Sequence, residues 1–531
     1  MIRDHDVNRW FTLGALLLAL TGLGLRLYAI DWGLPFVYDP DEPDFVQRAF
    51  AMLQSGNLDP GWFGHPGSTA IYSFLAAFGA LEIVGSSDLA AAAAAFREDP
   101  SPWFLAARVV IVLFATGTLV LAWQFARRIA GGAGAMLATG LLAASMLHTQ
   151  LSIIARSDMV MTFFVLLAML AVLSVATVGR WRDYLAAGFC LGLAIATKYP
   201  AAVFSLVIIG AHLLRLRDRS SPVWAEFPRL AAAGGATIAG IAVGSPYLLV
   251  SPLVVLRDLN FEARTYHLSG TSEGFLPALA SYLGGPILTD IGAIGAVLAV
   301  AGAWHALTRR HRSGQLALLA LAVYLAFISS LSLRWDRWAL PALPFVVALA
   351  ALGLSSAADA LRARSGARAV SAMVLVVTAV ALIQPTMASL PWTVATARDD
   401  SRDMASRWIL ENVPAGSAIL AESYTPQLPA DRYRLYTVEQ GRIWRLDTQG
   451  RRFAVPRGIV GTLADPGFIA RQGIDYVVIA NHYDRRLAEA ERYQRTIATY
   501  EAIMRSGEKV YEADQAPWVA IGLPVRIFRV R

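Results

Sequence analysis

Long apolar runs separated by short polar segments fill the first three-quarters of the chain. A helix needs about 20 apolar residues to cross the roughly 30 Å hydrocarbon core of a bilayer. By that measure we predict eleven spans, at residues 11–30, 105–126, 132–150, 159–178, 184–198, 200–214, 231–250, 287–307, 314–332, 339–358 and 369–389. The first run is long for a signal-peptide core and has no clear cleavage site, so we expect it to remain as an uncleaved helix. The pattern predicts a mainly α-helical, polytopic membrane protein.

The pattern changes near residue 393. The charged share rises from 12% of residues 1–393 to 27% of the residues after them. An amphipathic segment around Trp408 is followed by short runs typical of strands, at 417–420, 475–480 and 525–530. We therefore predict a transmembrane domain over residues 1–392 and a small soluble α/β domain over residues 393–531.

Arginine is unevenly distributed between alternate loops. One set of loops carries basic clusters, at residues 127–128, 180–182, 215–219, 309–312 and 362–368. The first long loop, 31–102, has two basic residues against ten acidic ones. The positive-inside rule places the basic clusters in the cytoplasm and this loop, with the C-terminal domain, outside. An apolar run at 67–85 would reverse every later loop if it crossed, so we expect it to lie at the membrane surface.

Composition excludes several other classes of protein. Hydrophobic residues make up 56% of the chain and charged residues 16%, with a mean hydropathy of +0.49. The net charge of +7 comes from basic residues scattered through loops, without the stripe that nucleic acid requires, so we expect no nucleic-acid partner. Cys190 is the single cysteine, which excludes an intrachain disulfide and a cysteine metal site.

The first external loop contains a cluster of acidic side chains. Four carboxylates lie within six residues: Asp39, Asp41, Glu42 and Asp44. Like charges raise one another's pKa values unless a cation is nearby, so the cluster indicates a metal site, an acid/base site, or both. Prolines at 40 and 43 restrict the backbone to a stiff turn. The alternative is an ordinary solvated loop that caps the helix beginning near Asp44.

The Asp41-Glu42 pair after the first helix is followed by an amphipathic helix, the His65-Pro66 step, many spans and an external C-terminal domain. In this combination the chain resembles the GT-C glycosyltransferases, in particular the bacterial branch of the protein O-mannosyltransferase and lipid A aminoarabinose transferase superfamily. Further short matches occur in the family's order, at residues 107–110, 127–128, 148–152, 155–158, 192–200 and 337–344. The resemblance covers nearly the whole chain.

The resemblance implies an inverting transfer of a sugar from a polyprenyl-phosphate donor to a hydroxyl acceptor, at the outer face of the cytoplasmic (inner) membrane. Asp41 occupies the family's catalytic position and would act as general base, and Glu42 would assist or orient it. The Asp-Pro-Asp spacing of Asp39 and Asp41 also suits a divalent cation such as Mg²⁺ or Mn²⁺, bound through oxygen ligands. Some branches of the family work without metal.

Five further residues are candidates for binding the donor's sugar or phosphate. Arg156 and Asp158 lie at the external end of the fourth span, where they would be costly against lipid and are expected to face a cavity. Lys198 and Arg337 lie at external helix ends and could neutralise phosphate. His65 could contact phosphate or a metal. The alternatives are a structural salt bridge for the first pair, snorkelling for the second, and no ligand role for the histidine.

Two other functions remain open at this stage. A transporter also contains intramembrane charges, but here the charges lie near one face and no inverted repeat is evident. A non-catalytic lipid-binding scaffold would not need the clustered carboxylates. If the chain is a transferase, its partners are the lipid-linked donor, membrane lipids and an acceptor that is a glycan, a lipid or a protein. The external loop 251–285 could order as a lid on donor binding.

Overall fold

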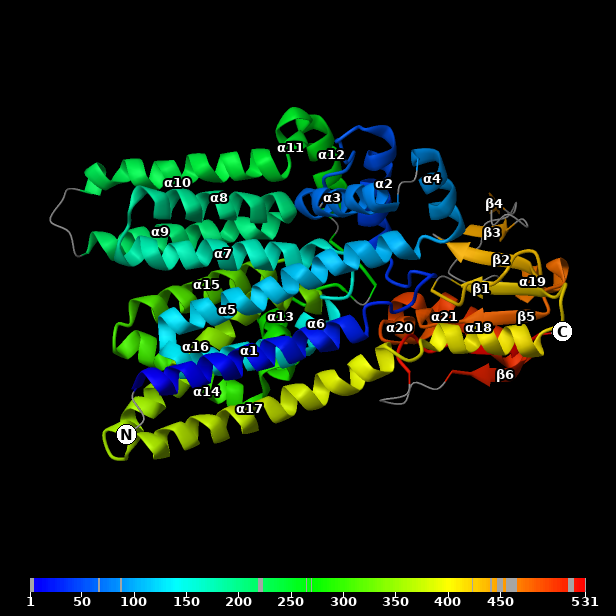
Figure 1. Ribbon diagram of the computed structural model, residues 1–531. Coiled ribbons are helices and arrows are strands. Elements are labelled where there is room, and N and C mark those ends of the chain that lie inside the picture. Colours follow the sequence, from blue (N-terminus) through cyan, green and yellow to red (C-terminus); the bar gives the residue numbers. More distant parts are fainter. Residues whose placement is uncertain are drawn as a thin grey trace. The chain divides into compact units, whose positions relative to one another are not determined.

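The computed structural model describes residues 4–64, 67–85, 88–217, 223–263, 265–268, 270–422, 424–439, 442–446, 452–454, 466–513 and 520–530. The chain divides into two compact units, coloured along the sequence in Figure 1. The helical unit comprises Met1–Asp31, Asp39–Tyr266 and Gly270–Thr393. The C-terminal unit comprises Trp32–Tyr38, His267–Ser269 and Val394–Arg531.

The helical unit is built almost entirely from helices, which run largely alongside one another (Figure 1). Its main elements are α1 (Asp4–Tyr28), α2 (Glu42–Ser55), α3 (Ser68–Gly85), α4 (Leu89–Glu98), α5 (Ser101–Ala144), α6 (Met146–Gln150), α7 (Ser157–Thr177), α8 (Trp181–Thr197), α9 (Ser205–Leu216), α10 (Val223–Gly244), α11 (Tyr247–Val250), α12 (Pro252–Glu262), α13 (Phe275–Tyr282), α14 (Leu288–Thr308), α15 (Arg312–Ser329), α16 (Leu343–Arg362) and α17 (Ala367–Thr396). Short 3₁₀ turns at Tyr199–Phe204 and Asp336–Ala342 precede α9 and α16. Within the described residues, nine helical segments are long and apolar enough to cross a membrane. The predicted fold class is confirmed.

The difference between eleven predicted spans and nine observed segments has two sources. The predicted spans 105–126 and 132–150 form one 44-residue element, α5, that is interrupted at Gly131, where φ is 71° and ψ is −171°. A positive φ is readily adopted only by glycine, so the helix direction changes at this residue. The predicted span 184–198 corresponds to α8, whose 17 residues are slightly short of a full span.

Close backbone contacts hold neighbouring helices together in the helical unit. A Cβ atom on Gly302 of α14 would lie 1.9 Å from the Leu349 carbonyl oxygen of α16, and one on Gly353 would lie 2.0 Å from the Leu298 oxygen. Only glycine fits such contacts. Small residues at helix interfaces are typical of membrane bundles, where van der Waals packing and not hydrophobic burial drives association.

The described residues of the C-terminal unit form a seven-stranded sheet that helices cover. Its strands are β1 (Ala418–Glu422), β2 (Arg434–Glu439), β3 (Arg442–Leu446), β4 (Arg452–Ala454), β5 (Tyr476–Ile479), β6 (Glu508–Glu512) and β7 (Arg526–Arg529), and its helices are α18 (Ser401–Asn412), α19 (Pro466–Gln472), α20 (His482–Leu487) and α21 (Ala490–Ser506). The strand order is β4-β3-β2-β1-β5-β7-β6. Strand β1 is parallel to both β2 and β5, and the other pairs are antiparallel. The predicted strands at 417–420, 475–480 and 525–530 correspond to β1, β5 and β7.

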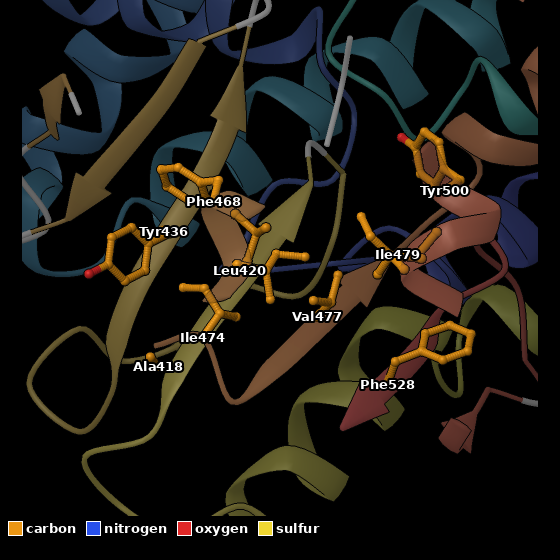
Figure 2. Close-up of a cluster of buried hydrophobic side chains, with 11 residues drawn as sticks. Ala418, Leu420, Tyr436, Phe468, Ile474, Val477, Ile479, Tyr500 and Phe528 are labelled. Atoms are coloured by element: carbon orange, nitrogen blue, oxygen red, sulfur yellow. The ribbon is translucent and has the colours of Figure 1, made fainter. Parts of the chain in front are cut away.

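Alternate side chains of the central strands enter two different cores. Leu420, Val477 and Ile479 point into one cluster beside Tyr500 of α21 (Figure 2). Ile419 belongs to a second cluster with residues of α18. This alternation follows from the two-residue period of a strand, and it means that helices cover both faces of the sheet.

Candidate active site

The carboxylate loop, residues 39–42, leads directly into α2. The helix begins at Glu42 with Pro43 in its first turn, where a proline fits because the amide at that position has no partner within the helix. Asp39 Oδ1 accepts hydrogen bonds from the backbone amides of Asp41 and Glu42, at 3.0 and 3.1 Å. The side chain of Asp39 therefore caps the start of α2 and fixes the turn that carries Asp41.

Glu42 is fully buried and anchors this loop to the bundle. Its carboxylate receives two hydrogen bonds from the Arg108 guanidinium of α5, at 2.7 and 2.8 Å, and one from the Ala155 amide at 2.8 Å. Arg108 also donates to the carbonyl oxygen of Ile30 at 2.9 Å. Both oxygens of the carboxylate are engaged, so the contacts suit Glu42 to orienting the loop.

Arg108 is the site residue that sequence reasoning missed. It lies in a long apolar run and is fully buried. An arginine within a membrane helix is costly unless it is paired, and that was the signal that could have identified it.

Asp41 is the carboxylate of the loop that remains accessible. Its side chain is 33% exposed, against 10% for Asp39 and 0% for Glu42. Arg156 joins the two aspartates, since its Nε lies 3.0 Å from Asp39 Oδ1 and its Nη2 donates to Asp41 Oδ2. Arg337 Nη1 lies 3.3 Å from the same Asp41 oxygen. Two predicted site residues that are distant from the loop in sequence, Arg156 and Arg337, therefore meet at Asp41.

The other predicted pair has separate partners. Asp158, at the start of α7, accepts a 2.6 Å hydrogen bond from Lys198 Nζ, and both side chains are buried. Asp158 therefore forms its salt bridge with Lys198. Arg156 instead contacts Asp39 and Asp41 of the carboxylate loop. His65 lies outside the described residues.

Opposite charges balance within this group. The acidic members are Asp39, Asp41, Glu42 and Asp158, and the basic members are Arg108, Arg156, Lys198 and Arg337. Burial raises the pKa of Asp39 above its ordinary value, and the charge of Arg156 opposes that shift. Because each buried charge has a partner of opposite sign, several ionised side chains can lie together in this largely buried site.

The geometry at Asp39 and Asp41 suits a guanidinium better than a metal ion. Both carboxylates are directed at Arg156. Among the residues that the structure describes, no group of three histidine, cysteine or acidic side chains converges on one point. A divalent cation bound by Asp39 and Asp41 would have to displace this arginine.

A second buried carboxylate lies in the C-terminal unit. Glu422, at the end of β1, accepts hydrogen bonds from the Tyr500 hydroxyl at 2.5 Å and from the Ala480 amide at 2.6 Å. Burial raises the pKa of Glu422 to about 7, and these hydrogen bonds oppose the shift. The side chain joins β1 to α21 and to the residue after β5.

This raised pKa predicts a stability that depends on pH. The folded chain holds a proton on Glu422 up to about pH 7, whereas an unfolded glutamate loses it near pH 4.3, so stability falls as the pH rises through this interval. The expected loss is about 4 kcal/mol, because one pKa unit corresponds to about 1.4 kcal/mol. Glu422→Gln should remove the dependence. Amide exchange of Leu420, compared between the two proteins at each pH, measures the change; Glu491→Gln, an exposed glutamate of α21, is the control. An equal pH dependence in wild type and Glu422→Gln would contradict the prediction.

Comparisons with known proteins are consistent with this architecture. The family model described as dolichyl-phosphate-mannose-protein mannosyltransferase matches residues 102–243, a segment that contains Arg108, Arg156, Asp158 and Lys198. A comparison with curated proteins finds no match.

Three solved structures have a similar fold along most of their length. ArnT from Cupriavidus metallidurans in the apo state gives a TM-score of 0.52 at 14% identity, covering 97% of this chain and 97% of that chain. The same protein bound to undecaprenyl phosphate gives 0.50 at 14% identity, covering 98% and 97%. The oligosaccharyltransferase AglB from Archaeoglobus fulgidus, in complex with an inhibitory peptide and a dolichol-phosphate, gives 0.51 at 12% identity, covering 98% and 88%. At these identities the likeness shows a shared fold.

Proposed function

We propose that this chain, which has the fold of the GT-C membrane glycosyltransferases, transfers a sugar from a polyprenyl-phosphate donor to a hydroxyl acceptor with inversion at the anomeric carbon. The observation that carries the proposal is Asp41: it is the accessible carboxylate of a rigid loop, and two arginines contact it. The arginine-poor first loop supports a site at the outer face of the cytoplasmic membrane.

In this reaction Asp41 takes the proton of the acceptor hydroxyl as the oxygen attacks the anomeric carbon. The bond from that carbon to the phosphate oxygen breaks, and its electron pair leaves with the polyprenyl phosphate. Arg337 is the cation best placed for the departing phosphate, because its side chain is 25% exposed and that of Arg156 is 9% exposed. Arg156, held by Asp39, orients Asp41. The guanidinium group of an arginine suits phosphate, because it can donate two parallel hydrogen bonds to the phosphate oxygens.

The remaining site residues act through position. Glu42 and Arg108 fix the loop to α5, and Lys198 with Asp158 joins the start of α7 to the segment after α8. Both pairs are buried in the helical unit. We assign them to shaping the donor site and not to proton transfer.

The solved relatives support a lipid-phosphate donor. ArnT was determined with undecaprenyl phosphate and AglB with a dolichol-phosphate, and the matched family model is described by a dolichyl-phosphate sugar. We extend this chemistry to the present chain as part of the proposal. The acceptor is a glycan, a lipid or a protein that presents a hydroxyl group.

The test is a transfer assay on the purified chain with a panel of undecaprenyl-phosphate sugars of known anomeric configuration. Mass spectrometry of lipid-linked sugars and surface glycans, with and without the gene, selects the panel. The expected result is release of undecaprenyl phosphate together with a product of opposite configuration. A transporter or a lipid-binding scaffold would leave every donor intact, and a product of retained configuration would exclude the inverting mechanism.

A further inference from the structure

The seven residues Trp32–Tyr38, here called the strap, connect α1 to the carboxylate loop but pack in the C-terminal unit. Trp32 Nε1 donates to Asp400 Oδ2 at 3.2 Å. Gln427 Nε2 donates to the carbonyl oxygen of Phe36 at 2.9 Å. The strap is therefore held near both of its ends by side chains more than 360 residues further along the chain.

Tyr38, the last residue of the strap, is its most restrained part. Its hydroxyl donates to Asp403 Oδ1 at 2.5 Å, and its ring lies under the Arg402 guanidinium at 3.7 Å. Arg402 is in turn fixed by two 2.7 Å hydrogen bonds to Asp400. Both members of that pair are buried, so the surface that holds Tyr38 is itself rigid.

The backbone just before Tyr38 is in an unusual conformation. Val37 has a φ of 51°, a left-handed value that is strongly disfavoured for a β-branched residue and persists only where the surroundings enforce it. Residues with such backbone strain persist only where the surrounding structure fixes them, and they cluster at functional sites. The contacts of Tyr38 supply the restraint on one side of Val37. On the other side the backbone amide of Val37 donates a hydrogen bond to the Gly33 carbonyl oxygen, at 2.9 Å.

One guanidinium of the helical unit holds the chain on both sides of the strap. Arg108 holds the Ile30 carbonyl before the strap and the Glu42 carboxylate after it. A single peptide bond joins Tyr38 to Asp39, whose carboxylate fixes the turn bearing Asp41. Any displacement of Tyr38 is thus transmitted to the carboxylate loop through the main chain.

We propose that the C-terminal unit positions the carboxylate loop through the strap, with Arg402, Asp400 and Asp403 as positioning residues. For catalysis, this inference rests on the proposed function of Asp41. A misplacement of about 1 Å at a reacting group can reduce a rate about 100-fold, so even a partial release of Tyr38 has a measurable effect. The C-terminal unit would then be required for the reaction through its hold on the strap.

The test compares Tyr38→Leu with Tyr433→Phe in the full-length protein. Tyr433 is a matched control, because it is a buried tyrosine of the same unit whose hydroxyl donates to Ile409 and Val413 carbonyls. In Tyr38→Leu we expect the amides of Asp41 and Glu42 to exchange with deuterium about 10-fold faster, because their acceptor Asp39 loses the restraint on its N-terminal side and keeps only its contact with Arg156. The amides of β1 should keep their protection. The turnover number for the donor should fall about 10-fold with little change in KM.

Unchanged exchange at Asp41 and Glu42 in Tyr38→Leu would overturn the inference. Where Tyr38→Leu also loosens β1, Asp403→Asn decides, since it keeps the size of the side chain and weakens one hydrogen bond. Faster exchange in a protein that transfers no sugar from any donor would refute the proposed function and leave the positioning role standing. If sugar transfer requires Asp41 but is unchanged in Tyr38→Leu, the proposed function stands and the positioning of the carboxylate loop by the C-terminal unit is refuted.

Discussion

Replacement of Asp41 by asparagine is expected to lower the turnover number about 100- to 10,000-fold, the range typical of removing a general base. The change keeps the size of the side chain and removes its ability to take a proton. Binding of undecaprenyl phosphate should be unchanged or tighter, because Arg156 and Arg337 lose the negative charge that they now share. A steady-state assay of kcat and KM, together with binding of undecaprenyl phosphate, measures both effects.

The matched control is Asp44→Asn, three residues further along α2, where the side chain is exposed. It should retain near wild-type turnover. An Asp41→Asn protein with kcat within about threefold of wild type would eliminate Asp41 as the base. Equal losses in the two variants would instead point to a general effect of charge in this loop.

A comparison of Asp41 with Glu42 distinguishes a residue that takes part in the reaction from one that holds the loop in place. Asp41 is one-third exposed and contacts cations, whereas both oxygens of Glu42 are occupied inside the protein. Loss of Glu42 should therefore reduce the amount of folded protein as much as its activity. Loss of Asp41 should spare folding and remove activity.

Much of the fold could be predicted from local patterns. Apolar runs of span length identify most of the helices because the bilayer sets their length, and period-two runs identify strands β1, β5 and β7. Hydropathy also predicted separate spans at 105–126 and 132–150, on either side of the kink at Gly131. The positive φ of Gly131, which makes this kink, could not be predicted from hydropathy.

The site was predictable only where its residues are neighbours in the sequence. Asp39, Asp41 and Glu42 lie within four residues, so their cluster is visible in the sequence itself. The choice of partners was not predictable, because Arg156 lies 115 residues from Asp41 and only helix packing brings them together. For the same reason the sequence gives no sign that Tyr38 meets Asp403, 365 residues away.

The second large effect is expected for Arg108→Ala, which should lower the free energy of unfolding by about 3–5 kcal/mol. The substitution leaves the Glu42 carboxylate buried with no counter-charge, and it also removes the hydrogen bond to the Ile30 carbonyl. Unfolding in a graded series of denaturing detergent, followed in purified protein, measures the loss. Arg128→Ala is the control on the same helix, because Arg128 donates to the neutral groups Leu170 O and Ser174 Oγ and leaves no buried charge behind.

A double variant tests whether the penalty comes from the uncompensated charge. In Glu42→Gln/Arg108→Met no ionised group remains at the pair, and replacing a buried ion pair by groups of similar volume is often nearly neutral. We therefore expect the double variant to recover most of the stability that Arg108→Ala loses. Recovery of stability without recovery of turnover would mean that the pair sets the geometry of the loop as well as its folding, since Asp41 would then be present in a folded protein but incorrectly placed. A double variant as unstable as Arg108→Ala would show that the lost contacts, and not the buried charge, dominate the effect.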